Sequence, residues 1–307
     1  MERFGIDRPD LRYGLEIFDG SEAFRGADFA VTRAALAQGG RVRGIRVPGA
    51  AGGAGGLSRK ALDEIEAAAK SAGAGGLLRL RRTNGVLEGP AAKFLSPEAA
   101  ASLAIEEGTL ALLVAGPDRI SSPALDRVRQ EVARRLNLIP RDERRFLWVT
   151  DFPLFERDAE TGALTAVHHP FTSPHLDDLA LLDTAPERVR AQAYDVVLNG
   201  TELGGGSIRI GDPRLQERVF ALLGIDEQTA RARFGFLLEG LRAGAPPHGG
   251  IAFGFDRIAM LLAGAGSLRD VIAFPKTTKA QALFEGAPAP VPERELEELH
   301  VRFVGLD

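Results

Sequence analysis

Hydrophobic residues recur at helical and strand spacing through the first half of the chain. Leu62 and Ala69 lie on one face of a helix that the pattern begins at Ser58 and ends near Gly73. The glycine-rich stretch 48–56 before it is typical of a flexible surface loop. Short apolar runs predict strands at 44–47, 76–80 and 110–114.

A second helix is predicted further along, where apolar residues repeat at helical spacing from Leu125 to Leu136. Ser122 suits the N-cap of this helix and Pro123 its first turn. Helices that alternate with short strands in this way predict a compact α+β module over residues 21–140.

The second half of the chain is denser in aromatic, histidine and proline residues. The run FLWVTDFPLF at 146–155 alternates like a strand and is interrupted at Pro153. Further helices are predicted after Asp212, after Asp226, over 257–262 and after Pro292. This region predicts a second body of mixed strands and helices.

Composition narrows the class of protein. The 307 residues are 45% hydrophobic and 26% charged, with a net charge of −4 and no cysteine. This profile predicts a soluble globular protein without disulfides or thiolate metal sites, in agreement with a cytoplasmic location. The charged N-terminus lacks the apolar core of a signal peptide, and no apolar run is long enough to span a membrane.

The stretch TELGGGSIRI at 201–210 predicts a strand with an unusual glycine run. It fits neither a dinucleotide fingerprint nor a Walker-type phosphate loop. Alternation places Ser207 and Arg209 on one face and directs Ile208 and Ile210 to the core. Glycines inside a strand indicate that another group approaches the backbone closely. A glycine-rich hairpin with a solvated Arg209 is an equally supported interpretation.

Two acidic residues precede and open this strand. Asp195 and Glu202 flank Asn199-Gly200, a pair typical of a tight hairpin turn. Two carboxylates beside a phosphate-bearing substrate are suitable ligands for Mg²⁺. A solvated acidic pair is the more common outcome at this spacing.

The stretch VHHPFTSP at 167–174 contains adjacent histidines. His168 and His169 point in opposite directions on an extended chain, so we do not expect both to serve one site. In the simpler interpretation, one of the two histidines is structural and the other is exposed. In the more specific interpretation, one of them donates a hydrogen bond to an anionic group of the substrate. The usual zinc patterns are absent.

The stretch PPHGGIAFGFDRIAML at 246–261 runs from a Pro-Gly loop into a predicted helix. Arg257 lies in the first turn of that helix, where the helix dipole disfavours a cation. An arginine in this position indicates an anionic or stacked partner such as a nucleotide.

Together these stretches resemble the bacterial aspartyl-tRNA synthetases over essentially the whole chain. GGIAFGFDRIAML resembles motif 3 of class II synthetases, and NGTELGGGSIRI and HHPFTSP resemble segments specific to the aspartyl enzyme. The resemblance implies an α+β fold with a partial class II antiparallel sheet flanked by helices. It also implies three parts: 1–20 from the catalytic domain, 21–140 as an inserted α+β GAD module, and 141–307 as the catalytic domain's C-terminal part.

The resemblance also assigns roles to individual residues. Arg209 would bind the side-chain carboxylate of aspartate, with His168 against the amino acid, and Asp195 and Glu202 would hold Mg²⁺ on the phosphates of ATP. Arg209, Arg257 and Glu202 would act on the reacting groups as aspartate attacks the α-phosphate in line. The aspartyl-adenylate pocket would be lined by Ser207, Gly204, Gly205 and Gly206. The ATP site would be formed by Glu202, Gly254, Phe255, Asp256 and Arg257.

The chain departs from the family by lacking the anticodon-binding OB domain, motif 1 and motif 2. We therefore expect the C-terminal part of an aspartate–tRNA ligase, inactive or weakly active alone. Its expected partners are L-aspartate, ATP and the aspartate tRNA, and the asparagine tRNA is an alternative substrate. We expect the full-length enzyme to be a homodimer. A non-catalytic synthetase-like protein that binds aspartate, adenylate or a partner is the alternative from another class. A generic α+β nucleotide-binding domain is a third.

Overall fold

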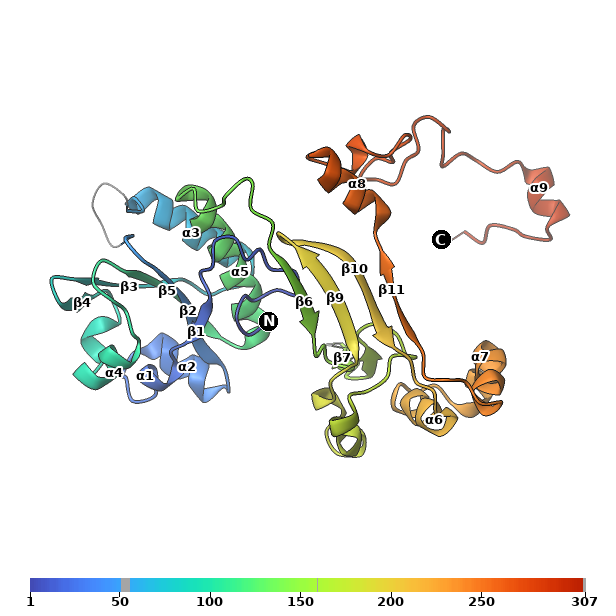
Figure 1. The fold of residues 1–307 in the computed structure, drawn as a ribbon, viewed down its shortest axis with the longest axis horizontal. Helices are drawn as coiled ribbons and strands as arrows, with labels where there is room; N and C mark the ends of the chain where they lie inside the picture. Colours follow the sequence, from blue (N-terminus) through green and yellow to red (C-terminus); the bar gives the residue numbers. More distant parts are fainter. Residues whose placement is uncertain (51–55, 159, 306–307) are drawn as a thin grey trace. The chain divides into compact units, whose positions relative to one another are not determined.

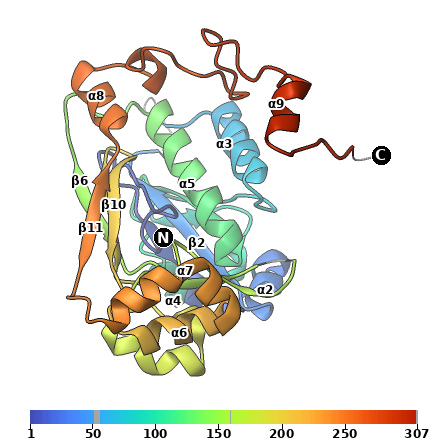
Figure 2. The same ribbon diagram turned by 90° about the vertical axis from the view of Figure 1, so that its right-hand side faces the viewer.

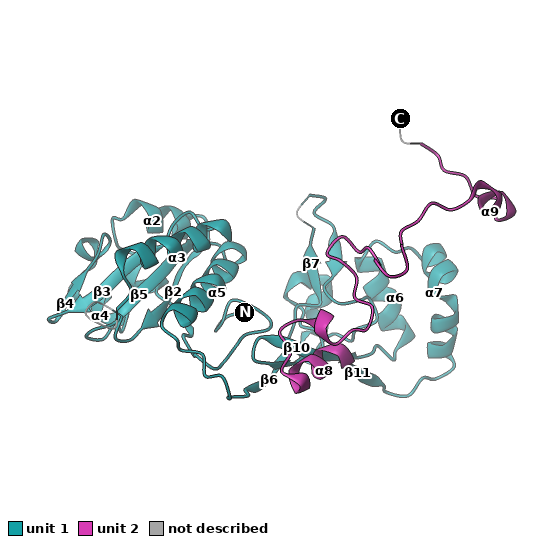
Figure 3. Ribbon diagram, turned by 90° about the horizontal axis from the view of Figure 1, so that it is seen from above, with its two compact units in different colours: residues 1–252 teal, residues 253–307 magenta. Residues whose placement is uncertain are grey.

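The computed structural model describes most of the chain, and the predicted loop at 48–56 falls largely outside it. The described residues are 1–50, 56–158 and 160–305. Contacts divide the chain into two units, residues 1–252 and residues 253–307 (Figure 3). The two units are described separately.

The first half of unit 1 is built on a five-stranded antiparallel sheet of order β1-β2-β5-β3-β4 (Figure 1). Its strands are β1 (Ile17–Asp19), β2 (Arg41–Val47), β3 (Leu78–Thr83), β4 (Val86–Glu88) and β5 (Leu110–Gly116). Its helices are α1 (Ser21–Phe24), α2 (Ala30–Ala37), α3 (Arg59–Ser71), the 3₁₀ turn η1 (Ala92–Phe94), α4 (Pro97–Ser102) and α5 (Asp118–Arg135).

Two apolar cores lie on the two faces of this sheet. Ile65 of α3 and Leu125 of α5 pack with Leu112 of β5 on one face. Phe24 of α1 and Leu103 beyond α4 pack with Leu113 on the other. Alternate β5 residues thus enter different cores, which is why this strand reads as a continuous apolar run.

The predicted start of α3 is confirmed, and the predicted start of α5 is wrong. The Ser58 side chain caps α3, as expected. Helix α5 begins at Asp118, so Ser122 is not its N-cap and Pro123 lies inside it. Asp118 suits the positive end of the helix, and the buried Arg43 donates to Ser122 Oγ at 2.9 Å. This tertiary contact, which local sequence does not record, occupies the hydroxyl that the prediction assigned to capping.

The second half of unit 1 carries a four-stranded sheet of order β11-β10-β9-β6 (Figure 1), in which β10 and β6 each pair antiparallel with β9. Figure 2 shows β6, β10 and β11 from another side. Its strands are β6 (Phe146–Thr150), β9 (Ala193–Leu198), β10 (Thr201–Ile208) and β11 (Gly249–Phe253), and β7 (Phe155–Arg157) pairs with β8 (Leu164–Ala166) beside it. The remaining elements are η2 (Leu176–Asp183), η3 (Pro186–Arg188), α6 (Pro213–Leu222) and α7 (Glu227–Arg242). Asp212 and Asp226 cap α6 and α7 through their side chains, as predicted.

The first residues of the chain join the five-stranded sheet. Ile17 of β1 pairs with Ile45 and enters the core shared with α3 and α5. The assignment of 1–20 to a catalytic domain and of 21–140 to a separate module remains a prediction. The structure adds that the two stretches share one sheet.

Unit 2 contains the end of the chain. It holds α8 (Phe255–Ala263), which ends at Gly264 in a left-handed conformation with φ of 63°, η4 (Leu268–Asp270) and α9 (Glu293–Glu298). Phe274 and Phe284 stack with ring centroids 4.5 Å apart. Among the described residues of the whole chain, no helix has the length and apolar character required to cross a membrane.

The predicted α+β class, with antiparallel sheets and flanking helices, is confirmed.

Candidate active site

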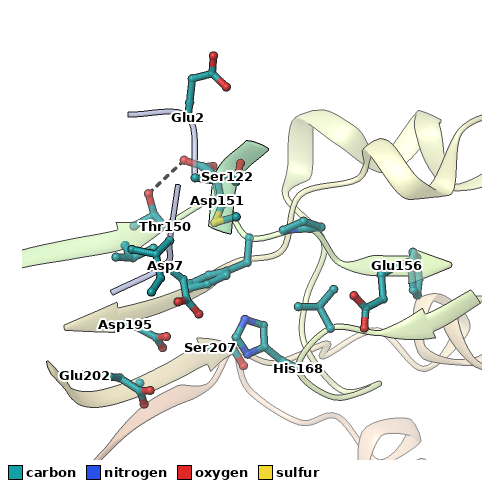
Figure 4. A pocket seen from close by; sticks show the side chains of 18 of the residues that line it. Glu2, Asp7, Ser122, Thr150, Asp151, Glu156, His168, Asp195, Glu202 and Ser207 are labelled. Carbon is teal, nitrogen blue, oxygen red and sulfur yellow. Dashed lines mark hydrogen bonds between the residues drawn. The ribbon is translucent and has the colours of Figure 1, made fainter. Parts of the chain in front are cut away.

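A cavity of about 1240 Å³ opens over one face of the second sheet (Figure 4). Strands β9 and β10 form its floor through Asp195, Glu202 and Ser207. Most of the residues to which the sequence assigned an amino-acid or metal role line this one space: His168, Asp195, Glu202, Gly205, Gly206, Ser207 and Arg209.

A β-bulge decides which residues of β10 share the face of Asp195. Glu202 pairs with Val197, but Gly205 pairs with Asp195, so Leu203 is an extra residue in the ladder. In a regular strand, Glu202 and Ser207 are five residues apart and would face opposite sides. The bulge restores them to one face, with Gly205 between them. The sequence prediction that Glu202 and Arg209 serve one site requires such an irregularity.

The glycine run makes room for the chain's own groups. A Cβ on Gly205 would lie 2.1 Å from Asp195 Oδ1, and a Cβ on Gly206 would lie 1.8 Å from the carbonyl oxygen of Gly250. Gly205 therefore lets the Asp195 carboxylate lie across β10, and Gly206 lets β11 approach. Gly204 is buried and is not among the residues that line the cavity.

Arg209 is held beside a histidine that the sequence prediction left without a role. Its Nη1 donates to His169 Nδ1 at 3.0 Å, and the backbone N–H of Phe171 approaches the same nitrogen at 3.2 Å. Partial burial lowers the pKa of His169, and the charge of Arg209 lowers it further. The ring is therefore neutral at pH 7, accepts at Nδ1 and can donate at Nε2.

Both histidines line the cavity, and the expectation that they do not both serve one site stays a prediction. The His168 ring stands edge-on to Phe152 with centroids 4.7 Å apart. The backbone on both sides of Thr172 pairs with the end of β10. Ser173 N donates to Ile208 O at 2.9 Å, and Ile210 N donates to Phe171 O at 3.0 Å. This pairing brings both rings to the sheet.

The two isoleucines of the glycine stretch differ in environment. Ile210 is buried in the core around Leu154 and Val219, as expected. Ile208 is 38% exposed, so its assignment to the core is wrong. It lies on the face opposite the cavity, where Phe146 and Trp148 of β6 are also exposed.

The floor of the cavity carries concentrated negative charge. Burial raises the pKa of the Asp195 carboxyl above its ordinary value, and the charges of Glu202 and Asp7 add to the increase while His168 opposes it. Asp195, Glu202 and Asp7 lie near one another in Figure 4. Among the described residues, no cluster of three or more acidic or histidine side chains has the geometry of a metal site. The pair nevertheless offers the oxygen donors that Mg²⁺ takes together with substrate phosphates.

Sequence reasoning missed the contribution of the N-terminal segment. Met1, Glu2, Ile6 and Asp7 line the cavity although they lie about 190 positions from β9. Nothing in their spacing pointed to the site, because the contact depends on the tertiary fold.

Four of the five predicted ATP-binding residues lie at the start of α8 in unit 2, and the fifth, Glu202, lies in β10. Gly254 occupies the N-cap position without a side-chain cap, and Asp256 and Arg257 lie in the first turn. Phe255 is 80% exposed. These four residues lie at a helix start, as predicted. Their role in binding ATP stays a prediction.

A protein family model and curated proteins match most of the chain. The family model described as tRNA synthetases class II (D, K and N) matches residues 1–278. The aspartate–tRNA(Asp/Asn) ligase of Caldanaerobacter subterraneus subsp. tengcongensis is 49% identical over 306 residues, 98% of this chain and 51% of that protein. The aspartate–tRNA ligase of Geobacillus kaustophilus is 49% identical over 308 residues, 99% of this chain and 52% of that protein. The chain thus spans about half the length of the curated relatives it matches.

Among solved structures, an aspartyl tRNA synthetase from Entamoeba histolytica is 25% identical, with a TM-score of 0.35. The alignment covers 50% of this chain and 26% of that one.

Proposed function

The chain belongs to the class II tRNA synthetases (D, K and N), and we propose that it supplies the amino-acid side of the active site of an aspartate–tRNA ligase. The proposed reaction activates L-aspartate with ATP to aspartyl-adenylate and then transfers aspartate to tRNA in the cytoplasm. The names of the relatives include both the aspartate tRNA and the asparagine tRNA.

The observation that carries this proposal is the arrangement of Arg209 and the acidic pair in one cavity. Arg209 has a planar guanidinium with several donors, and only Nη1 is directed to His169. The remaining donors can meet both oxygens of a carboxylate, which is the geometry that distinguishes an aspartate side chain from asparagine. His169 holds the guanidinium in plane without adding a competing negative charge.

The acidic residues suit the other end of the substrate. Asp195 and Glu202 would hold Mg²⁺, which neutralises phosphate charge when bound. Ser207, Gly205 and Gly206 would leave a flat floor for the adenylate. Gly254, Phe255, Asp256 and Arg257 would contribute the nucleotide site, with the Arg257 guanidinium against ATP. Catalysis then depends on positioning and charge stabilisation rather than on a general base.

Three measurements test the proposal. Isothermal titration with the sulfamate analogue of aspartyl-adenylate should show binding by the chain, and Arg209→Ala should abolish the thermal shift that aspartate produces. Aspartate-dependent ATP–pyrophosphate exchange by the 307 residues alone should be weak or absent, because the relatives are about twice as long. Strong exchange would overturn that expectation, and absence of analogue binding would overturn the proposal. The homodimer remains part of the proposal for the full-length enzyme.

A further inference from the structure

Residues 1–16, called here the entry segment, form part of the cavity wall but belong to neither sheet. Met1, Glu2, Gly5, Ile6 and Asp7 line the cavity, and the segment then runs into β1. A stretch without regular secondary structure keeps a fixed position only when other groups bind its backbone.

Arg129 of α5 binds the entry segment from a fully buried position. Its side chain is 0% exposed, and it donates to the carbonyl oxygens of Leu15 at 2.8 Å and Gly14 at 2.8 Å, with longer contacts to Phe4 and Asp10. The guanidinium also lies 4.9 Å from the ring centroid of Phe4. A buried cation is costly unless its donors are satisfied, so these carbonyls are held in place by the same contacts that stabilise Arg129.

Arg43 of β2 binds the beginning of the same segment. It is 1% exposed and donates to Glu2 O at 2.9 Å and to Met1 O at 3.2 Å. Its other terminal nitrogen donates to Ser122 Oγ at 2.9 Å, which ties it to α5. The two buried arginines thus hold both ends of the entry segment on one scaffold.

The entry segment also comes close to the turn that joins the two strands carrying the acidic pair. Asp10 Cβ and Arg8 O lie 3.6 and 3.8 Å from the position that a Cβ on Gly200 would take. Gly200 is in the turn that joins β9 to β10. Arg12 donates to Pro140 O at 3.2 Å, in the connection to β6. The entry segment therefore lies between the five-stranded sheet and the strands of the cavity floor.

We propose that Arg129 and Arg43 are positioning residues for the cavity, through which the five-stranded sheet and α5 hold the entry segment against the β9–β10 hairpin. Both act on the wall through the backbone carbonyls that they bind, although Arg43 is itself among the residues that line the cavity. Their role is to fix the wall that bears Asp7 opposite Asp195 and Glu202. This inference rests on the proposed function for the identity of the ligand, but the link between the arginines and the wall can be measured without any ligand.

The absence of cysteine from the chain allows a direct distance measurement. Spin labels at Arg8→Cys and Glu156→Cys report the span from the entry segment to the opposite side of the cavity, because both positions are exposed. Arg129→Lys keeps the charge but cannot reach several carbonyls, so the distance distribution should broaden. Arg135→Lys is the matched control, because Arg135 lies on the same helix but pairs with Glu64 and Glu131.

A second label pair separates positioning from a general loss of structure. Labels at Glu156→Cys and Arg214→Cys lie in the second half of unit 1, and their distance distribution should stay unchanged in Arg129→Lys. If Arg129→Lys does not fold, Arg43→Lys tests the other end of the segment with the same labels. An unchanged distribution for the first pair in folded variants would overturn the inference.

Ligand binding connects the wall to the site. The affinity for the sulfamate analogue of aspartyl-adenylate should fall about tenfold or more in Arg129→Lys and stay unchanged in Arg135→Lys. A broadened distribution with unchanged affinity would overturn the positioning role. If the wild-type chain binds no analogue, the proposed function fails, while the label distances still decide whether the arginines hold the segment.

Discussion

The carboxylate of Asp195 lies across β10 directly above Gly205, in space that any side chain at 205 would occupy. The bulge at Leu203 sets this register, and it brings Glu202 and Ser207 to the same face. One missing side chain and one extra residue therefore define the acidic end of the cavity.

Substitution of the two neighbouring glycines should have separable effects. In Gly205→Ala the new Cβ meets the end of a mobile side chain, so Asp195 moves and the free energy of unfolding changes by less than about 1 kcal/mol. In Gly206→Ala the Cβ meets the Gly250 backbone, and we expect a loss of about 1–3 kcal/mol. Urea unfolding measures both values. Analogue binding in the presence of Mg²⁺ should be weakened in Gly205→Ala despite its near-normal stability, and equal losses of stability would contradict this explanation.

Replacement of Arg209 by lysine should weaken aspartate binding although the charge is kept. Lysine cannot meet two carboxylate oxygens in a fixed plane and also reach His169 Nδ1, so we expect a loss of about 10- to 100-fold in affinity. Titration calorimetry with aspartate measures the change. Arg214→Lys is the control, because Arg214 is an 89% exposed arginine at the start of α6. Normal affinity in Arg209→Lys would remove the bidentate role.

His169 should titrate below its ordinary pKa of 6.5, because partial burial and then the charge of Arg209 disfavour its protonated form. The unfolded chain binds this proton more readily, so the folded state loses stability as the pH falls through 6.5. Imidazole NMR signals followed against pH give the pKa directly. In Arg209→Leu the pKa of His169 should rise toward its ordinary value, whereas Arg214→Leu should leave it unchanged. An unaltered His169 titration in Arg209→Leu would show that the 3.0 Å contact does not act electrostatically.

Removal of the Asp195 charge should stabilise the folded chain slightly while it abolishes binding of Mg²⁺. The pKa of Asp195 is raised in the folded state, so its contribution to stability is lost as the pH rises above 3.8. Asp195→Asn should therefore gain less than about 1 kcal/mol at pH 7 and nothing at acid pH, since the group is only partly buried. Denaturant unfolding at both pH values gives the comparison. In the presence of the sulfamate analogue, added Mg²⁺ should stabilise only the wild-type chain further, and an equal further gain in the variant would exclude Asp195 as a ligand.

Much of the local structure could be predicted because its causes are local. The side chains of Ser58, Asp212 and Asp226 accept hydrogen bonds from backbone N–H groups two or three positions away. Each of these helix starts therefore depends only on neighbouring residues and can be predicted from the local sequence. Asn199 and Gly200 adopt φ angles of 49° and 82°, as a tight hairpin turn requires. The predicted start of α5 at Ser122 is wrong: the helix begins at Asp118, and the Ser122 hydroxyl accepts from Arg43, which is 79 positions away.

Spacing and resemblance are enough to predict the hairpin with its two acids, the glycine run, the histidine pair and Arg209 as the candidate residues. How these residues meet depends on contacts that form only in the folded chain. The bulge at Leu203, the pairing of Arg209 with His169 and the wall formed by the entry segment each depend on contacts between distant parts of the chain. Periodicity records which face a side chain takes within one regular element. It does not record an extra residue in a ladder or a buried arginine that binds the backbone of another segment, because those interactions form only when the elements pack together.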